Sequence, residues 1–374
     1  MSSWDIFCSV VDNFGDVGVC WRLARQLSQE HCFQVRLWVD DLETFAVMSP
    51  ELSPLLARQK LGSVEVLHWT PECTVDSAAD VVIEAFGCEL SDNYLNAIVQ
   101  REKTPVWINL EYLSAESWVE ECHGLVSPHP RLPLKKYFFY PGFTEKTGGL
   151  LRERGLLASH AGVSAADDAL FLNQLGVPDR QPHEVRLSLF CYENPILPDL
   201  LSTWAHNSVP IRVLASPGAA RKQLADWFQR ELVDGMPLTR GTLTVHPIPF
   251  LVHTEYDRLL RVCDLNFVRG EDSFIRAQWA KRPFVWQIYP QSENTHLVKL
   301  EAFLSRYLSL MPDVARQAVR NLWYVWNGAV SPGNEWGDFL ANLGVIQSQT
   351  EQWSSQLDRM PDLVDNLVRF VQEK

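Results

Sequence analysis

The sequence predicts an α/β protein built from two doubly wound parallel-sheet domains, followed by a helical tail. Three observations lead to this prediction. Apolar, strand-like segments alternate with segments of helical periodicity from the first residues onward. The alternation is interrupted once, around Gly148–Pro182, and then restarts, and from about Asn294 the periodicity is helical almost throughout. Such alternation is typical of parallel sheets covered by helices on both faces.

Residues 1–152 are predicted to form the first domain. After its first strand we expect a helix with Val19, Leu23 and Leu27 on one face, because apolar residues four positions apart share a helix face. Helical periodicity also extends over Asp92–Arg101. The strand candidates of this domain are Ile6–Val11, Val35–Val39, Val64–His68, Val81–Phe86, Val106–Leu110 and Leu125–Ser127.

A linker region is predicted over residues 153–183, a second domain over 184–350 and a helical tail over 351–374. In the tail, Leu363, Leu367 and Phe370 have helical spacing. Two Rossmann-like domains that face each other across a cleft, with a last helix that packs back on the first, are typical of the GT-B architecture of glycosyltransferases. The strand candidates of the second domain are Val185–Cys191, Ile211–Ala215, Leu243–Ile248, Asp264–Val268 and Phe284–Ile288.

Composition narrows the class of protein. The chain has 374 residues, 46% of them hydrophobic and 21% charged, which is enough for two sizeable cores. A formal net charge of −13 argues against binding to nucleic acid and suits a basic protein partner. The eight cysteines are scattered without a C-x-x-C pair, so we expect reduced core residues.

The sequence contains no signal that directs it to a membrane. The N-terminus lacks the basic and apolar regions of a signal peptide, and no apolar segment reaches the roughly 18 residues of a spanning helix. We therefore expect a cytoplasmic protein without a membrane partner. We also expect a monomer as the default.

Two aspartates follow the first strand candidate in the sequence VVDNFGDVGVCW. Asp12 and Asp16 lie four residues apart, with Gly15 between them, at the carboxyl edge where open α/β sheets bind ligands. Neighbouring carboxylates raise each other's proton affinity, which favours a general base. In the alternative interpretation, Asp16 caps the following helix and Asp12 is a turn residue.

A second polar loop follows the strand candidate Asp264–Val268. Arg269 suits phosphate oxygens, Gly270 permits close approach, and Asp272 or Ser273 is expected to cap a helix whose first amides attract anions. The loop thus predicts a diphosphate site, in which Glu271 faces a sugar hydroxyl or a cationic acceptor rather than the phosphates. A capped helix with a surface Arg–Glu pair is the alternative.

Aromatic residues end two further strand candidates. Phe190 and Tyr192 end the first strand of the second domain, where they could line a ligand pocket or, for Phe190, belong to the core. Phe250 follows Leu243–Ile248 and could stack on a pyrimidine. The sequence contains no Asp-x-Asp, H-E-x-x-H, P-loop or G-x-S-x-G pattern, so we expect no metal and no cofactor.

The segments VVDNFGDVGVCWRLARQL and NFVRGEDSFIRAQWA…KRPFVWQIYPQ resemble the EarP family, the rhamnosyltransferases that modify an arginine of elongation factor P, and the resemblance extends over essentially the whole chain. It implies a GT-B enzyme that moves L-rhamnose, with inversion, from dTDP-β-L-rhamnose to a guanidinium nitrogen of its protein acceptor. It also implies an N-terminal acceptor-binding domain and a C-terminal nucleotide-sugar-binding domain.

The resemblance implies a role for individual residues as well. The essential acidic residues of the family match Asp12, Asp16 and Glu271. We assign Asp16 as the general base and Asp12 as a residue that orients the acceptor, although the sequence does not decide which of them takes the proton. The donor site implied by the resemblance consists of Phe190, Tyr192, Phe250, Arg269, Asp272, Ser273 and Tyr289.

Three hypotheses of function follow. The first is protein-arginine rhamnosylation. The second is a GT-B enzyme that transfers another nucleotide sugar to a small-molecule acceptor. The third is a protein that binds a nucleotide sugar without catalysis. Three acidic residues that converge on one site argue against this third hypothesis.

Overall fold

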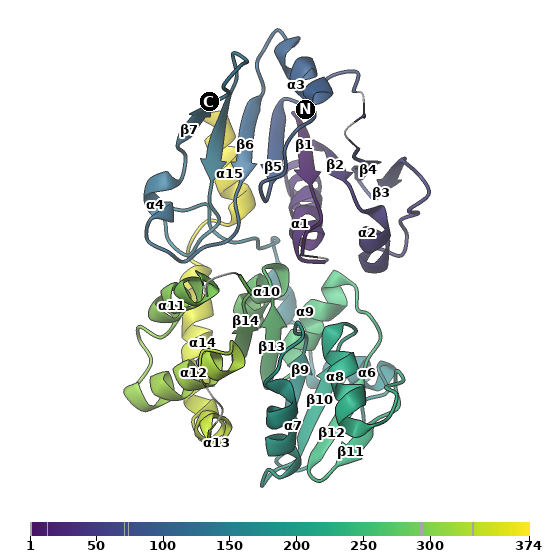
Figure 1. Cartoon of the computed structure of the whole chain (residues 1–374), viewed down its shortest axis with the longest axis vertical. Helices are drawn as coiled ribbons and strands as arrows, with labels where there is room; N and C mark the ends of the chain where they lie inside the picture. Colours follow the sequence, from purple (N-terminus) through teal and green to yellow (C-terminus); the bar gives the residue numbers. More distant parts are fainter. Residues whose placement is uncertain (1, 13, 71, 74, 292–294, 331–332) are drawn as a thin grey trace. The chain divides into compact units, whose positions relative to one another are not determined.

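The computed structural model describes residues 2–12, 14–70, 72–73, 75–291, 295–330 and 333–374. The chain forms two compact units (Figure 1), one comprising residues 1–154 and 358–374, the other residues 155–357. Each has its own sheet and its own core. Within the described residues, no helix combines the length and the apolar composition that crossing a membrane requires.

The first unit is organised around a sheet with the strand order β3-β4-β2-β1-β5-β6-β8-β7. The pairs β3·β4 and β7·β8 are antiparallel and the other pairs are parallel. From β1 the chain builds outward through β2 and β4 on one side and through β5 and β6 on the other. The strands are β1 (Ser3–Cys8), β2 (Gln34–Val39), β3 (Arg58–Leu61), β4 (Val64–His68), β5 (Val81–Ala85), β6 (Val106–Leu110), β7 (Val126–Pro128) and β8 (Lys135–Phe139).

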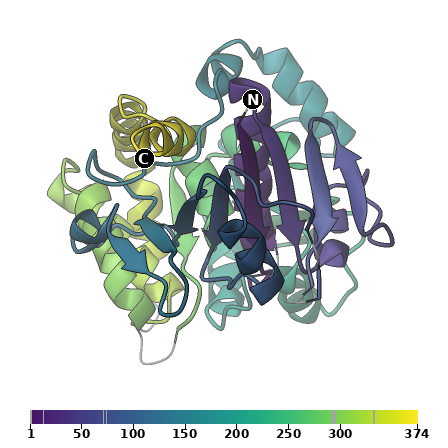
Figure 2. The same cartoon turned by 90° about the horizontal axis from the view of Figure 1, so that it is seen from above.

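Helices cover this sheet, and one of them comes from the end of the chain. The helices are α1 (Phe14–His31), α2 (Leu42–Met48), α3 (Asp92–Val99), α4 (Val119–Cys122) and α15 (Leu363–Gln372). In α15, drawn in yellow in Figure 2, the amide of Leu363 donates to the carbonyl of Leu150 (2.9 Å), and Asn366 donates to the carbonyl of Gly148 (3.0 Å). These bonds tie the last helix to the unit that contains the first strand.

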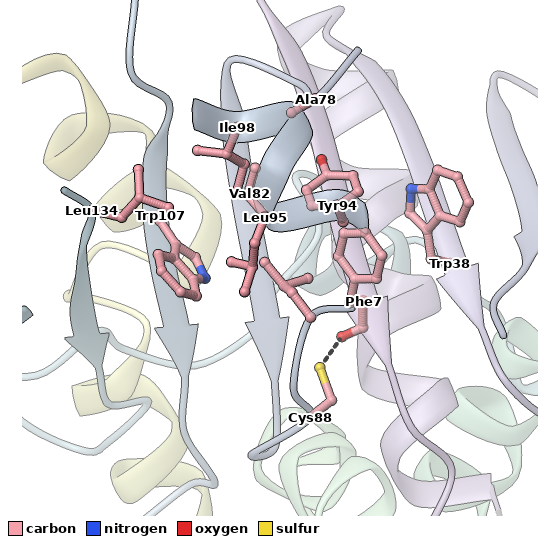
Figure 3. Packing of buried hydrophobic residues seen from close by; sticks show 11 residues of the cluster. Phe7, Trp38, Ala78, Val82, Cys88, Tyr94, Leu95, Ile98, Trp107 and Leu134 are labelled. Carbon is pink, nitrogen blue, oxygen red and sulfur yellow. Dashed lines mark hydrogen bonds between the residues drawn. The ribbon is translucent and has the colours of Figure 1, made fainter. Parts of the chain in front are cut away.

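A buried cluster between α3 and the sheet fixes the centre of this unit (Figure 3). Phe7 of β1 stacks on Trp38 of β2, with ring centroids 5.4 Å apart, and meets the ring of Tyr94 edge-on at 4.6 Å. The thiol of Cys88 donates to the carbonyl of Phe7 (3.3 Å). Rings packed from three elements hold β1 in place, and the loop and helix that follow β1 carry two of the predicted site residues.

The second unit repeats the same plan, with the strand order β11-β12-β10-β9-β13-β14. All of its strand pairs are parallel except β11·β12. The strands are β9 (Val185–Leu189), β10 (Ile211–Ala215), β11 (Leu238–Arg240), β12 (Leu243–Pro247), β13 (Leu265–Arg269) and β14 (Phe284–Gln287). The helices are α5 (Leu156–Ala161), α6 (Ala165–Gln174), α7 (Leu197–Ala205), α8 (Ala219–Phe228), α9 (His253–Val262), α10 (Asp272–Ala280), α11 (Thr295–Tyr307), α12 (Asp313–Trp326), α13 (Glu335–Ala341) and α14 (Leu343–Leu357).

The structure refines several of the expected elements. The segment predicted as a linker contains α5 and α6, which belong to the second unit. The predicted tail is divided, because α14 belongs to the second unit and α15 to the first. Strands β3, β8 and β11 have no counterpart in the sequence-based prediction, and the first strand ends at Cys8 rather than at Val11. All eight cysteines are free thiols, but Cys32 is exposed rather than part of a core.

Candidate functional site

The loop after β1 is shaped by the carboxylate of Asp16. Asp16 is the third residue of α1 and is only 2% exposed. Its Oδ2 accepts hydrogen bonds from the amides of Val11 (2.9 Å) and Asp12 (2.8 Å), which lie before the helix. Asp16 thus lies within the helix, and its carboxylate binds the loop before it.

The environment of Asp16 sets its proton affinity. Burial raises the pKa of its carboxyl group above the ordinary value, while the amides of Asp12 and Val11 and a hydrogen bond with the side chain of Tyr112 lower it. The negative charge of Asp40 raises it again, and the net direction is upward. A buried carboxylate with a raised pKa is a suitable proton acceptor. Asp40 thus contributes a carboxylate that raises the pKa of Asp16, and the amide of Asp12 contributes a hydrogen bond that lowers it.

Asp12 lies half-buried against the start of α1. Its carbonyl accepts a hydrogen bond from the amide of Gly15 (2.7 Å), and a Cβ on Gly15 would come within 2.8 Å of Asp12 Oδ2. Gly15 is therefore required for the close approach of the Asp12 side chain rather than for an unusual backbone angle. This places both aspartates at the carboxyl end of β1.

Sequence reasoning missed two residues of this site, Asp40 and Tyr112. Asp40 directly follows β2, and Tyr112 lies two residues after β6, so both stand at the same sheet edge as Asp12 and Asp16. Each follows a strand that the sequence did predict. The rule that carboxyl ends of parallel strands gather functional groups would have found them.

In the second unit, Arg269 lies between two aromatic rings. It is the last residue of β13 and is 8% exposed. Its guanidinium carbon lies 4.4 Å from the ring centroid of Phe190 and 4.5 Å from that of Tyr192, both of which follow β9. Stacking of this kind fixes the plane of the guanidinium and directs its N–H donors. Phe190, half-buried, is therefore part of this cluster.

The loop after Arg269 differs in detail from the prediction. The Ser273 hydroxyl accepts from the amide of Arg269 (3.0 Å) and donates to its carbonyl (2.5 Å), so Ser273 does not cap α10. Asp272 is the first residue of α10, and Glu271 occupies the N-cap position. In the described stretch 265–280, the side chain of Glu271 makes no capping hydrogen bond to the helix. The expected cap by Asp272 or Ser273 is thus wrong, because Ser273 closes the turn at Arg269 instead.

Close backbone contacts support this loop. Gly270 has φ +57, a left-handed conformation that favours glycine, and its carbonyl accepts from Trp286 Nε1 (2.8 Å). Glu271 and Asp272 are half-buried at the start of α10, and His253 Nε2 lies 4.0 Å from Asp272 Oδ2. Arg269, Glu271 and Asp272 are therefore placed together at the carboxyl end of β13.

The remaining aromatic residues stand around the same edge. Tyr289, 45% exposed, follows β14 and meets the ring of Tyr192 edge-on at 5.4 Å. Phe250, half-buried, follows β12 at the same edge. Gln287, which sequence reasoning missed, accepts from the amide of Tyr192 (2.9 Å) and so holds the segment that carries this ring.

These two constellations allow different chemistry. The first unit presents a buried carboxylate suited to accept a proton. The second presents a planar cation between rings, beside a helix start, which suits phosphate oxygens and the flat face of a base or sugar. Within the described residues, no three His, Cys, Asp or Glu side chains form a group that could hold a metal ion.

Comparison with known proteins gives a consistent picture. Residues 4–372 match the model of the family described as elongation factor P (EF-P) rhamnosyltransferase EarP. The chain is 47% identical to the protein-arginine rhamnosyltransferase of Pseudomonas putida, over 99% of this chain and 98% of the relative. It is 46% identical to the enzyme of the same name from Pseudomonas aeruginosa, with 99% of each chain covered.

Solved structures agree in fold. The structure described as the basis for EarP-mediated arginine glycosylation of translation elongation factor EF-P covers 100% of both chains, at 35% identity and a TM-score of 0.72. A glycosyltransferase from Rickettsia africae, only 7% identical, matches with a TM-score of 0.53 over 100% of this chain and 98% of that chain, and it supports the fold alone. The predicted GT-B class of the fold is confirmed.

Proposed function

The chain belongs to the EarP family of elongation factor P rhamnosyltransferases, and from this premise we propose that it transfers L-rhamnose from dTDP-β-L-rhamnose to one arginine of elongation factor P, with inversion at the anomeric carbon. That it is a protein-arginine rhamnosyltransferase is carried by its identity of 47% to such an enzyme along nearly the whole chain. The donor, the acceptor protein and the inversion are the parts that we propose.

The proposed reaction is a single displacement. A guanidinium nitrogen attacks the anomeric carbon, the bond from that carbon to the diphosphate oxygen breaks, and the electron pair leaves with dTDP. Arginine is a poor nucleophile because its pKa lies above about 12 and its lone pairs are delocalised. A carboxylate must therefore orient the guanidinium and accept its proton as the new bond forms.

We assign the acid–base work to the first unit. Asp16 is the general base, because its carboxylate is fixed by two amides and burial raises its pKa. Asp12, half-buried beside it, orients the acceptor guanidinium. Because the Asp16 carboxylate accepts these two amides, its position relative to the end of β1 is fixed.

We assign the donor to the second unit. Arg269, with its plane fixed by Phe190 and Tyr192, stabilises the departing diphosphate, together with the start of α10. Phe250 stacks on thymine, Tyr289 borders the same pocket, and Glu271 contacts the acceptor guanidinium or the sugar. In this proposal the charge on the leaving group is balanced by protein groups, without a metal ion or cofactor.

The test is the intact mass of elongation factor P after incubation with this protein and dTDP-β-L-rhamnose in a buffer that contains EDTA. We expect a gain of one deoxyhexose, located on an arginine by fragmentation. A panel of other dTDP- and UDP-sugars serves as the comparison. Transfer of a different sugar alone, or no transfer until metal is added, would contradict the respective part of the proposal.

A matched variant separates catalysis from binding. Asp16→Asn keeps an oxygen that can accept the two loop amides but removes the base, so we expect no measurable transfer while dTDP binds as in the unmodified protein. Calorimetric titration with dTDP checks the binding. Loss of dTDP binding in this variant would contradict the assignment of donor and base to different units.

A further inference from the structure

Two carboxylates hold the segment that follows β1. Asp40, directly after β2, accepts from the hydroxyl of Ser9 (2.5 Å) and from the amide of Val10 (2.9 Å). The next two amides, those of Val11 and Asp12, donate to Asp16. Asp40 thus binds the first half of the segment Ser9–Asp12, and Asp16 binds its second half.

Two residues that follow β5 and β6, Phe86 and Tyr112, also help to hold Asp16. The side chain of Tyr112 makes a hydrogen bond with Asp16. The ring of Tyr112 is stacked on that of Phe86, with centroids 4.6 Å apart and planes inclined by 24°. Phe86 has φ +58, which is unfavourable for a residue with a large side chain, and its amide donates to the carbonyl of Leu110 (2.8 Å).

We propose that Asp40 and Tyr112 are positioning residues that hold the carboxylate of Asp16 in its reactive orientation, Asp40 through the segment Ser9–Asp12 and Tyr112 directly. The left-handed conformation of Phe86 fits this role, because it places a ring against which Tyr112 is stacked. The inference rests on the proposed function, in which Asp16 accepts the proton. It adds two residues that do not themselves have to touch the substrate.

The two residues act on the proton affinity of Asp16 with opposite sign. Asp40 raises the pKa of Asp16 by its negative charge, and the bond from Tyr112 lowers it. Other groups near this carboxylate include the amides of Val11 and Asp12, the half-buried carboxylate of Asp12 and, from β1, the thiol of Cys8. A general base works when it is deprotonated, so kcat falls as the pH drops through its pKa.

The test is the pH profile of kcat for rhamnose transfer by the full-length protein. In Asp40→Asn the acidic limb should move to lower pH, because a charge that favours the protonated form of Asp16 is removed. In Tyr112→Phe it should move to higher pH, because a bond that favours the ionised form is removed. The KM for dTDP-β-L-rhamnose should change by less than about twofold in both variants, since the donor is assigned to the other unit.

Two further variants separate the hydrogen bonds of the Asp40 side chain from its negative charge. Asn at position 40 can still accept the amide of Val10 and donate to the hydroxyl of Ser9, whereas Asp40→Ala loses both bonds. We expect kcat to fall by roughly 10- to 100-fold in Asp40→Ala and to be largely restored in Asp40→Asn at its optimal pH. Ser9→Ala, which removes a single bond, should give a smaller loss and serves if Asp40→Ala does not fold.

Matched controls are available in the chain. Asp41→Asn removes the same charge one residue away, at a side chain that caps α2 through the amide of Thr44 (2.9 Å). Tyr324→Phe removes a hydroxyl that donates to Glu301 Oε2 (2.5 Å) instead of to Asp16. Neither control should move the acidic limb of the profile.

The outcomes distinguish the two proposals. If the unmodified protein transfers no rhamnose, the proposed function fails, and hydrogen exchange of the peptide spanning residues 8–16 then tests the positioning. Faster exchange in Asp40→Ala than in Asp41→Asn supports it, and equal exchange overturns it. If the protein is active, shifts of the profile in the same direction for Asp40→Asn and Tyr112→Phe, or an unchanged kcat in Asp40→Ala, overturn the positioning alone.

Discussion

At the scale of single residues, the second unit depends on a property that arginine has and lysine lacks. The guanidinium of Arg269 is planar, and its carbon lies 4.4 and 4.5 Å from the ring centroids of Phe190 and Tyr192, so a flat cation can stack on these rings. An ammonium group carries the same charge, but its donors rotate and it has no plane to stack. The geometry therefore selects arginine for its shape as well as for its charge.

This difference predicts the effect of Arg269→Lys. We expect dTDP to bind about 5- to 30-fold more weakly, which corresponds to roughly 1 to 2 kcal/mol for the lost stacking and forked hydrogen bonding. Calorimetric titration measures the change. The matched control is Arg258→Lys in the same unit, since Arg258 lies 4.7 Å from the ring centroid of Phe171. Equal affinities of Arg269→Lys and the unmodified protein, or equal weakening in both variants, would contradict the role of Arg269.

At the scale of secondary-structure elements, α1 contains a glycine close to its start that helix propensity does not favour. Glycine costs up to about 1 kcal/mol relative to alanine within a helix. Gly15 is nevertheless accommodated there, and the space in which its side chain would stand is occupied by the carboxylate of Asp12. The helix thus loses some stability where the site needs room.

We therefore expect Gly15→Ala to separate stability from activity. The added Cβ would lie 2.8 Å from Asp12 Oδ2 and displace this carboxylate, so kcat should fall by about tenfold or more. The free energy of unfolding should stay equal or rise by up to about 1 kcal/mol. Urea unfolding and transfer assays on the same preparation measure both quantities.

A control for this variant lies in another helix. Gly344 is the second residue of α14, and a Cβ there would meet no atom within 4 Å. Gly344→Ala should change stability in the same direction as Gly15→Ala while transfer stays normal. Full activity of Gly15→Ala would show that Asp12 does not need its present position.

The elements also show which parts of the structure the sequence encodes locally. Buried parallel strands such as β5 and β6 are short apolar segments, and the prediction placed them within a residue of their bounds. The edge strands β3 and β11 were missed because half-exposed, polar strands such as Arg58–Leu61 do not show an apolar segment. Local periodicity identifies a strand most readily when burial on both faces makes it apolar.

The site shows the same limit. Asp12, Asp16 and Arg269 were identified because each belongs to a distinctive segment next to a strand. Asp40 and Tyr112 were missed because their partners lie far away in the sequence, and only the parallel strand order brings them to Asp16. The expected helix cap by Ser273 failed for a different, local reason, since its hydroxyl binds the backbone of Arg269 four residues earlier.

At the scale of the whole molecule, the chain returns at its end to the unit in which it began. Residues 358–374 belong to the first unit, separated in the sequence by the entire second unit. Leu363, Val364 and Leu367 of α15 are at most 1% exposed, and Phe370 packs edge-on against Tyr137 at 5.4 Å. The first unit therefore completes its core only after α15 has been synthesised.

This arrangement predicts a local effect of Leu367→Ala. The variant leaves a cavity under α15 and should lower the stability of the first unit by about 2 to 5 kcal/mol. The contacts of α15 described above all involve that unit, so hydrogen exchange should accelerate in peptides of α1 and β6 and stay unchanged in those of β9 and β13. Affinity for dTDP should be retained.

The control variant is Leu170→Ala. It removes the same atoms from a leucine that is 58% exposed, and should change stability by less than about 0.5 kcal/mol. Uniform acceleration of exchange in both units would show instead that the chain unfolds as one cooperative body, with α15 stabilising all of it.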